Sequence, residues 1–160
     1  MCTHRSLDHK DLETICSFPQ TEEELSYVSP KFVYPLTPDQ ILNLLEGRFE
    51  PTVILNNRTN EVVAYANIYG YDAEEGCGWL GNVIVSPKYR GQGAARYLLD
   101  VMLDKAKNNL GCKTMQLACH NTNSRGLAFY TKYGFKPFDI EIPGVEAKQL
   151  IAIHMRRELI

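Results

Sequence analysis

Long apolar stretches are absent from this sequence. No run approaches the ~20 apolar residues that a membrane-spanning helix needs, and residues 1–5 lead into no signal-peptide core. The sequence also lacks internal repeats, low-complexity segments and linkers rich in proline, glycine and serine. Because 160 residues with 44% hydrophobic content can bury one core, we expect a single domain over residues 1–160. The expected protein is cytoplasmic and has no membrane association.

Closely spaced cysteine pairs are also absent, and the net charge is small. The five cysteines form no Cys-x-x-Cys pair, which favours reduced thiols over a disulfide framework or a zinc site. The four histidines show no i, i+4 pairing, so we expect no metal. A formal net charge of -2 provides no general electrostatic reason to bind nucleic acid.

The most informative segment present is a strand, a glycine turn and a helix in succession. Residues 79–85 are apolar and rich in β-branched side chains, as in a buried strand, and Pro87 ends this pattern. Gly91 and Gly93 allow positive φ angles and a close approach of a bulky anion. From about Gly93, apolar residues recur at helical spacing: Leu98, Leu99, Met102, Leu103 and Ala106. The first amides of this helix, with Arg90 beside them, predict a pyrophosphate site.

Two common phosphate-binding motifs do not fit this segment. Gly93 is followed by Ala94-Ala95-Arg96, so the Gly-Lys-Ser/Thr end of a phosphate-binding loop is absent. A dinucleotide fingerprint would need Gly or Ala where Arg96 stands, and no early βαβ unit surrounds it. A glycine pair alone is also typical of purely structural turns.

The segment from Val85 to Ala95 resembles the acetyl-CoA signature of the GCN5-related N-acetyltransferases (GNAT). That signature, Arg/Gln-x-x-Gly-x-Gly/Ala, is matched by Arg90, Gly93 and Ala95. The resemblance implies that acetyl-CoA is the cosubstrate.

A second block, residues 123–135, resembles the same family's Asn-x-x-Ala-x-x-Phe-Tyr-x-Lys-x-Gly-Phe segment, with Gly126 in place of the usual Ala. Two blocks in the family's order are far more specific than either alone. The resemblance extends from about Val62 to the C-terminus.

The resemblance implies a role for specific residues in binding the cofactor. Pantetheine and the acetyl oxygen would pair with the main chains of Val83, Ile84 and Val85, whose side chains are consistent with plain core packing. The pyrophosphate would lie against Arg90, Gly91, Gln92, Gly93, Ala94, Ala95 and Arg96. Arg90 and Arg96 are also consistent with ordinary surface cations.

Two residues of the second block carry implied chemistry. Tyr130 matches the family tyrosine that serves as general acid for the CoA sulfur, because a phenol with a pKa near ~10 is protonated at neutral pH. The alternative is an aromatic residue that packs on the sheet. Asn123 matches the asparagine that binds the pantetheine arm, and it is also a good helix N-cap.

The general base is not evident. Many relatives place glutamate at about the position of Gly81 or of Ala118, and neither residue can take a proton. Candidates that would act through ordered water are Asp72, Glu74, Glu75 and His120, although a solvated loop better explains the three acidic residues and a capping or surface role better explains His120.

The amine acceptor has no decisive motif, so a small-molecule amine and a peptide amine both remain open. The acidic run Glu22-Glu23-Glu24 would attract a cationic amine or simply form a solvated face. Aromatic residues that would line an acceptor pocket, or only pack, are Phe32, Tyr34, Tyr65, Tyr69 and Tyr71. Some relatives dimerise, and the exposed edge of the last strand would serve for a homodimer.

The expected fold is mixed α/β, with a mostly antiparallel sheet flanked by helices in the order β-α-α-β-β-β-α-β-α-β-β. Strands are predicted at residues 2–7, 51–55, 61–71, 77–85, 114–119, 136–142 and 147–156, and helices at 8–18, after Thr21, after Thr37, from Gly93 and at 123–133. Thr21 and Thr37 both begin capping-box patterns.

These observations predict an N-acetyltransferase that works by direct attack of an amine on the thioester in a ternary complex. A covalent route through Cys119 is disfavoured, since a strand cysteine is usually a small core residue. The alternative from another class is an acyl-CoA-binding or regulatory module that keeps the fold without transfer chemistry.

Overall fold

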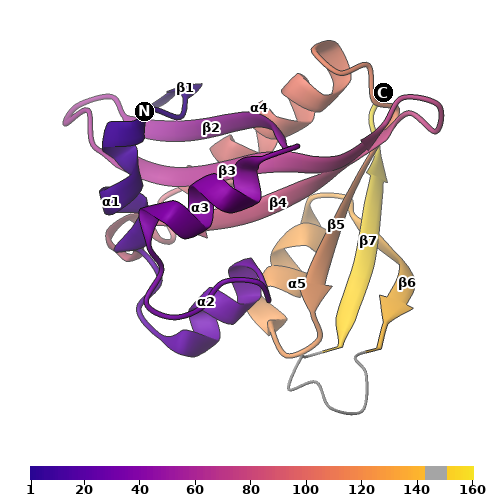
Figure 1. Ribbon diagram of the computed structural model, residues 1–160. Coiled ribbons are helices and arrows are strands. Elements are labelled where there is room, and N and C mark those ends of the chain that lie inside the picture. Colours follow the sequence, from indigo (N-terminus) through magenta and orange to yellow (C-terminus); the bar gives the residue numbers. More distant parts are fainter. Residues whose placement is uncertain (143–150) are drawn as a thin grey trace.

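The computed structural model describes residues 1–142 and 151–160 (Figure 1). Strands in these residues form one sheet in the order β1-β2-β3-β4-β5-β7-β6, in which only β4 and β5 pair in parallel. The strands are β1 (Cys2–Ser6), β2 (Phe49–Asn56), β3 (Val62–Asp72), β4 (Cys77–Val85), β5 (Thr114–His120), β6 (Lys136–Glu141) and β7 (Ala152–Glu158). The predicted mixed α/β class with a mostly antiparallel sheet is confirmed.

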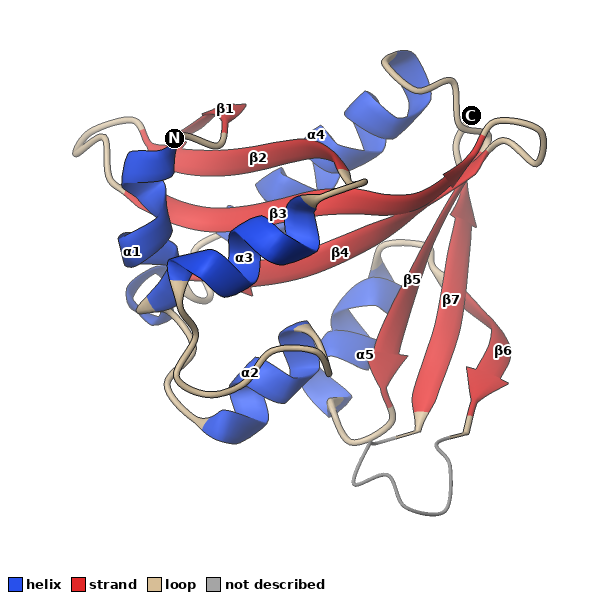
Figure 2. Cartoon of the chain, viewed as in Figure 1, coloured by secondary structure: helices blue, strands red, loops and turns tan. Residues whose placement is uncertain are grey.

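Helices cover both faces of this sheet (Figure 2). They are α1 (Leu12–Cys16), α2 (Glu22–Val28), α3 (Pro38–Leu45), α4 (Ala94–Asn108) and α5 (Ser124–Lys132). Three α-helices therefore separate β1 from β2, where the predicted order counted two. The predicted helix over residues 8–18 is a 3-10 turn, His9–Asp11, followed directly by the short α1.

The hydrophobic core has one cluster on each face of the sheet. On one face, the apolar stripe of α4, including Leu98 and Met102, packs with Met115 and Phe135. On the opposite face, α1 to α3 pack on the sheet through residues such as Ile15, and Tyr65 is fully buried among them. Alternating side chains along each strand supply the two clusters, as the pleat of a sheet requires.

The sheet opens between β4 and β5. These strands pair only at Cys77↔Thr114, Gly78↔Met115 and Trp79↔Gln116, and beyond this short ladder they diverge, as Figure 1 shows. The rest of β4 has no partner strand on that side. Its main-chain groups are therefore free to bind something other than protein.

A β-bulge in β4 lies at the start of this opening. Tyr65 of β3 pairs with Ile84 and Asn67 pairs with Gly81, so β4 carries one extra residue, Asn82, whose φ is 52°. A bulge bends its strand and redirects side chains. Asn82 consequently turns its side chain to the same side as Asn67, to which it is hydrogen bonded.

The last strand is not an edge strand, so that expectation is wrong. β7 pairs with β5 on one side and with β6 on the other, and the free edges of the sheet belong to β1 and β6. Of the strand predicted over residues 147–156, residues 147–150 lie outside the described residues, and β7 runs further toward the C-terminus. No helix in residues 1–142 or 151–160 has the length and apolar character needed to cross a membrane.

Candidate functional site

A cavity of about 1140 Å³ lies where β4 and β5 separate. The open half of β4, the end of β5, α5, the loop after β4 and residues of α2 line it. Segments far apart in the sequence thus meet around this cavity, and Figure 1 shows α2 and α5 below β4.

Most of the residues that the resemblance assigned to the cofactor line this cavity. They are Val83, Ile84, Val85, Arg90, Gly91, Gly93, Ala95, Arg96, Asn123 and Tyr130. Gln92 and Ala94 do not line it. The side-chain amide of Gln92 donates to the main-chain oxygen of Lys88 at 3.2 Å. Ala94, the first residue of α4, is buried in the core.

The turn before α4 depends on glycine for its conformation. Gly91 and Gly93 have φ angles of 76° and 86°, and a Cβ at either position would meet no atom within 4 Å. The requirement for glycine is thus the left-handed backbone and not a lack of space. Gly93 is the N-cap of α4 and provides no side chain to bond the first helical amides, so these amides are open to an anion.

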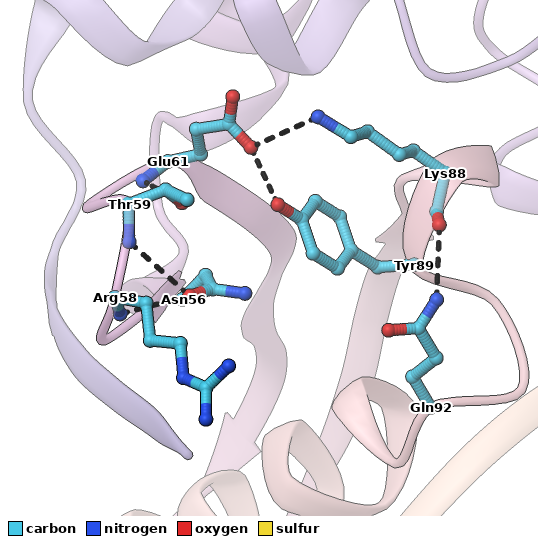
Figure 3. Close-up of polar contacts among 7 residues, drawn as sticks. All are labelled: Asn56, Arg58, Thr59, Glu61, Lys88, Tyr89 and Gln92. Atoms are coloured by element: carbon cyan, nitrogen blue, oxygen red, sulfur yellow. Dashed lines mark hydrogen bonds and ion pairs between the residues drawn. The ribbon is translucent and has the colours of Figure 1, made fainter.

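Side chains hold the loop in place on two sides. The Tyr89 hydroxyl donates to the Glu61 carboxylate at 2.5 Å, and Lys88 Nζ lies 3.4 Å from the same oxygen (Figure 3). Arg90 forms an ion pair of 2.5 Å with Glu24 of α2. The loop is therefore tied to the β2–β3 turn and to a helix on the opposite face.

The N-terminus of α5 explains the one departure from the family's second block. Asn123 caps the helix, because its side-chain oxygen accepts from the Gly126 amide at 3.0 Å. A Cβ at position 126 would lie 2.5 Å from Asn123 Nδ2. Glycine at 126 avoids this contact, whereas alanine would require the Asn123 side chain to shift. The N-cap role expected for Asn123 is confirmed, and Asn123 also lines the cavity.

Tyr130 lies beside Cys119 in the part of the cavity formed by α5 and β5. Burial, together with the neighbouring thiol, raises the pKa of Tyr130 above its ordinary value. Burial also raises the pKa of Cys119 to about 11. Both groups are consequently protonated at neutral pH. The phenol is a proton donor, and the thiol is a poor nucleophile.

His120 is the one predicted base that reaches the cavity. Burial lowers the pKa of this imidazole, so it is neutral near pH 7. Its Nδ1 is buried and has no hydrogen-bond partner in the described residues. Asp72, Glu74 and Glu75 do not line the cavity. The Asp72 carboxylate instead accepts from the amides of Glu74 and Glu75 within the β3–β4 turn.

The acid and base candidates lie on opposite faces of the sheet. Leu117 and Cys119 belong to the core cluster under α4 and α5, with Tyr130 packed against it. The alternate residue, His120, faces the other way, and its ring centroid lies 5.8 Å from that of Tyr27 in α2. The open strands thus place a proton donor on one side and a neutral imidazole on the other.

Comparison with known proteins accounts for this architecture. The sequence profile of the Acetyltransferase (GNAT) family matches residues 13–135. The chain belongs to the GNAT family. Over 63 residues it is 36% identical to the uncharacterized N-acetyltransferase YobR of Bacillus subtilis (strain 168), which is 39% of this chain and 25% of that protein. The alignment therefore spans about a quarter of that relative.

Solved structures with the same GNAT fold cover nearly the whole chain. Spermidine N-acetyltransferase from Vibrio cholerae, in complex with CoA and spermine, has a TM-score of 0.79 at 18% identity, and the match covers 99% of this chain and 95% of that one. Ard1 from Thermoplasma volcanium also has a TM-score of 0.79, at 22% identity, with 99% and 98% covered. At these identities the likeness concerns the fold.

Sequence reasoning missed Arg48, which lies between α3 and β2 and lines the cavity from the α2 side. Its Nη1 donates to Asn67 Oδ1 at 2.9 Å and to Asn82 Oδ1 at 3.3 Å. The guanidinium carbon lies 4.4 Å from the centroid of the Tyr69 ring. Burial lowers the pKa of this arginine from its ordinary value. No local motif marked Arg48, because its partners come from distant strands.

Among the aromatic residues considered for an acceptor pocket, only Tyr69 lines the cavity. Phe32 and Tyr65 are buried in the core. The Tyr71 hydroxyl donates to Leu110 O, and that of Tyr34 donates to Gln20 O at 3.3 Å. The side of the cavity near α2 is therefore formed by Tyr69, Arg48 and residues of α2 and its following loop.

Proposed function

We propose that this protein is an N-acetyltransferase that transfers the acetyl group of acetyl-CoA to a primary amine by direct attack in a ternary complex. The observation that carries the proposal is the cavity between β4 and β5, with a glycine turn at one end and Tyr130 and His120 on opposite faces. Its volume of about 1140 Å³ is comparable to that of ligand sites in general, which are ~300–1,000 Å³.

The residues around the cavity fit the implied cosubstrate in both size and chemistry. The uncapped amides at the start of α4, with Arg90 and Arg96 beside them, would hold the pyrophosphate. The main chain of Val83–Val85, which has no partner strand on the β5 side, would pair with the pantetheine amides. Acetyl-CoA supplies the activated acyl group as a thioester, and the protein supplies position, hydrogen bonds and proton transfer.

His120 is the proposed general base. Its imidazole is neutral at physiological pH because burial lowers its pKa, so it can accept the proton of an attacking amine directly or through one water. The glutamate positions of relatives are occupied by Gly81 and Ala118 in this chain, and His120 lies on the same strand as Ala118.

Tyr130 is the proposed general acid. Its raised pKa keeps the phenol protonated. The Tyr130 side chain lies beside Cys119, on the face of α5 that packs against the core. A departing CoA thiolate is a base whose conjugate thiol has a pKa near ~8.5, so proton donation from a nearby phenol assists its release.

The acceptor is proposed as a small-molecule or peptide amine. Relatives of the same fold include a protein named as a spermidine N-acetyltransferase and a ribosomal-protein-S18-alanine N-acetyltransferase, so this fold is compatible with both classes. Residues of α2 line the cavity, which supports an acceptor that binds against this helix.

The test measures release of the CoA thiol from acetyl-CoA across amines, amino acids, peptides and antibiotics, with acetyl-CoA binding measured in parallel. For Tyr130→Phe we expect kcat to fall by roughly 10²-fold with an unchanged Kd for acetyl-CoA, since general acids contribute about 10²–10⁴-fold. Tyr34→Phe, outside the cavity, is the control. Tight binding without any turnover would instead favour an acyl-CoA-binding module, and unchanged turnover in Tyr130→Phe would exclude Tyr130 as the acid.

A further inference from the structure

We propose that the acceptor amine carries a carboxylate close to the amine, as an α-amino acid does, and that Arg48 binds this carboxylate on the α2 side of the cavity. The inference rests on the proposed acetyl transfer and names its acceptor class. It depends on the position, the neighbours and the unused hydrogen-bond donors of Arg48.

Arg48 occupies the space next to Gly81, at about the position where many GNAT relatives have a glutamate. A Cβ at position 81 would lie 2.6 Å from Arg48 Nη1 and 2.6 Å from Tyr69 Cδ1. A side chain at 81 and the observed Arg48 therefore exclude each other. In this structure a guanidinium therefore occupies the space that a side chain at position 81 would need.

The Arg48 guanidinium has only neutral hydrogen-bond partners in the described residues. Asn67 and Asn82 both accept from Nη1, and no carboxylate of the described residues lies within ion-pair distance. An arginine has five N–H donors in a planar fork, so these two contacts leave Nη2 and Nε available. A partly buried cation of this kind is stabilised by a carboxylate, which it can bind through two parallel hydrogen bonds.

The carboxylates that line the cavity do not offset this charge. Glu24 is bonded to Arg90, and Glu141 lies 3.3 Å from His154 Nε2, while Glu23 is exposed. Lys31, in the segment after α2, adds another cation to the lining. A polyamine would place its second positive charge near Arg48, and like charges brought together in this way are unfavourable.

Arg48 and the proposed base lie on the same side of the sheet. Asn82, which accepts from Arg48, donates to Val28 O of α2 at 3.5 Å, and His120 lies against the adjacent residue Tyr27. A ligand with its carboxylate on Arg48 can therefore direct its amine toward His120 and the opening between the strands. An α-amino acid has these two groups on one carbon.

Matched acceptors test the inference on the unaltered protein. Each set contains an amino acid, its carboxamide and the amine without the carboxyl group: for example L-methionine, L-methioninamide and 3-(methylsulfanyl)propylamine, or L-phenylalanine, its amide and phenethylamine. We expect kcat/KM to be roughly 10- to 100-fold higher for the acid, since the free energy of a hydrogen bond between charged groups corresponds to a ratio of this size. Amine protonation cannot produce this order, because the amide has the least basic amine of each set. The dipeptides Asp-Ala and Asn-Ala separate a side-chain carboxylate from an α-carboxylate.

Variants locate the effect. Arg48→Gln should lower the ratio of kcat/KM between the acid and its carboxamide by roughly 10- to 100-fold, whereas Arg48→Lys should recover part of the preference. Arg58→Gln, in the exposed β2–β3 turn, is the control for net charge. If Arg48→Gln does not fold, the matched acceptors still decide.

Binding of the same compounds in the presence of CoA, measured by calorimetry, separates failure of this inference from failure of the proposed function. Turnover of polyamines, or equal turnover of acid and amide, would overturn the inference and leave acetyl transfer intact. Acids that bind only when Arg48 is present, without turnover of any amine, would support the site and overturn the enzyme. Absence of both turnover and acid binding would overturn both.

Discussion

His120 is the residue whose protonation should limit the reaction at low pH. Its pKa is lowered by burial, so the neutral form persists below pH 6.5 and is lost only as the pH falls through the lowered value. The ratio of kcat/KM between the unaltered protein and His120→Gln should therefore be constant above pH 6.5, at roughly 10²-fold, and decline below it. The measurement is a pH profile of both proteins.

Comparing a ratio removes the contribution of the substrate amine, whose own protonation is the same for both proteins. His9→Gln is the control, because His9 is exposed and lies outside the cavity. A ratio that does not change with pH would exclude His120 as the base.

At the residue scale, the sequence predicted which residues line the site better than it predicted which residues contact one another. The motif assigned the lining role of Tyr130 and Asn123, but only the fold separates His120 from the acidic candidates in the β3–β4 turn. Arg48 has no local signal because its contacts are to Asn67 and Asn82 on two other strands. Long-range contacts of this kind arise from the tertiary structure, and a single sequence does not contain them as a pattern.

At the scale of elements, strong patterns gave correct bounds and weaker capping patterns did not always hold. The predicted strand over residues 77–85 coincides with β4, because its apolar run is bounded by turns. Thr21 caps α2 as expected, accepting from the Glu24 amide at 3.1 Å. Thr37 makes no such bond to the start of α3, since the Gln40 side chain bonds instead to the main chain of the preceding loop. The Thr37 hydroxyl instead accepts from Gln40 Nε2 at 3.2 Å, so a different local contact replaces the expected cap.

The loop after β4 should bind the cosubstrate less well when its tether is removed. Tyr89→Phe deletes the 2.5 Å hydrogen bond to Glu61 that connects this loop to the β2–β3 turn (Figure 3). We expect the KM for acetyl-CoA to rise by roughly 2- to 5-fold with little change in kcat, since exposed charged contacts make small contributions. Steady-state kinetics with varied acetyl-CoA measure this.

Tyr71→Phe is the matched control for Tyr89→Phe, because the Tyr71 hydroxyl bonds to Leu110 O, away from the loop. A fall in kcat at constant KM would contradict the positioning role and place Tyr89 in the chemical step.

At the scale of the whole molecule, the divergence of β4 and β5 is the feature on which the proposed function depends. The sequence predicted both strands, but not that their ladder ends after the pair Trp79↔Gln116. Strand pairing depends on contacts across the sheet, and the expectation that the main chains of Val83, Ile84 and Val85 bind pantetheine came from the family resemblance alone. That residues 1–160 form a single domain stays a prediction, with which the one sheet of the described residues is consistent.

The arrangement of the whole fold predicts the kinetic mechanism of the proposed reaction. Because the acid and base candidates face opposite sides of one opening, cosubstrate and acceptor can be bound together, and no covalent intermediate is needed. Double-reciprocal plots for acetyl-CoA and amine should therefore intersect, and desulfo-CoA should compete with acetyl-CoA but not with the acceptor.

Cys119→Ala provides the matching chemical test. This thiol is buried, its pKa is raised to about 11, and its Sγ lies 3.9 Å from the main-chain oxygens of His120 and Asn123, so it is poorly suited to attack a thioester. We expect the variant to keep kcat within about threefold of the unaltered protein, because the thiol takes no part in the transition state. Parallel double-reciprocal lines together with an inactive Cys119→Ala would instead require an acetyl-cysteine intermediate. The acetyl group would then pass first from CoA to Cys119 and afterwards from Cys119 to the amine.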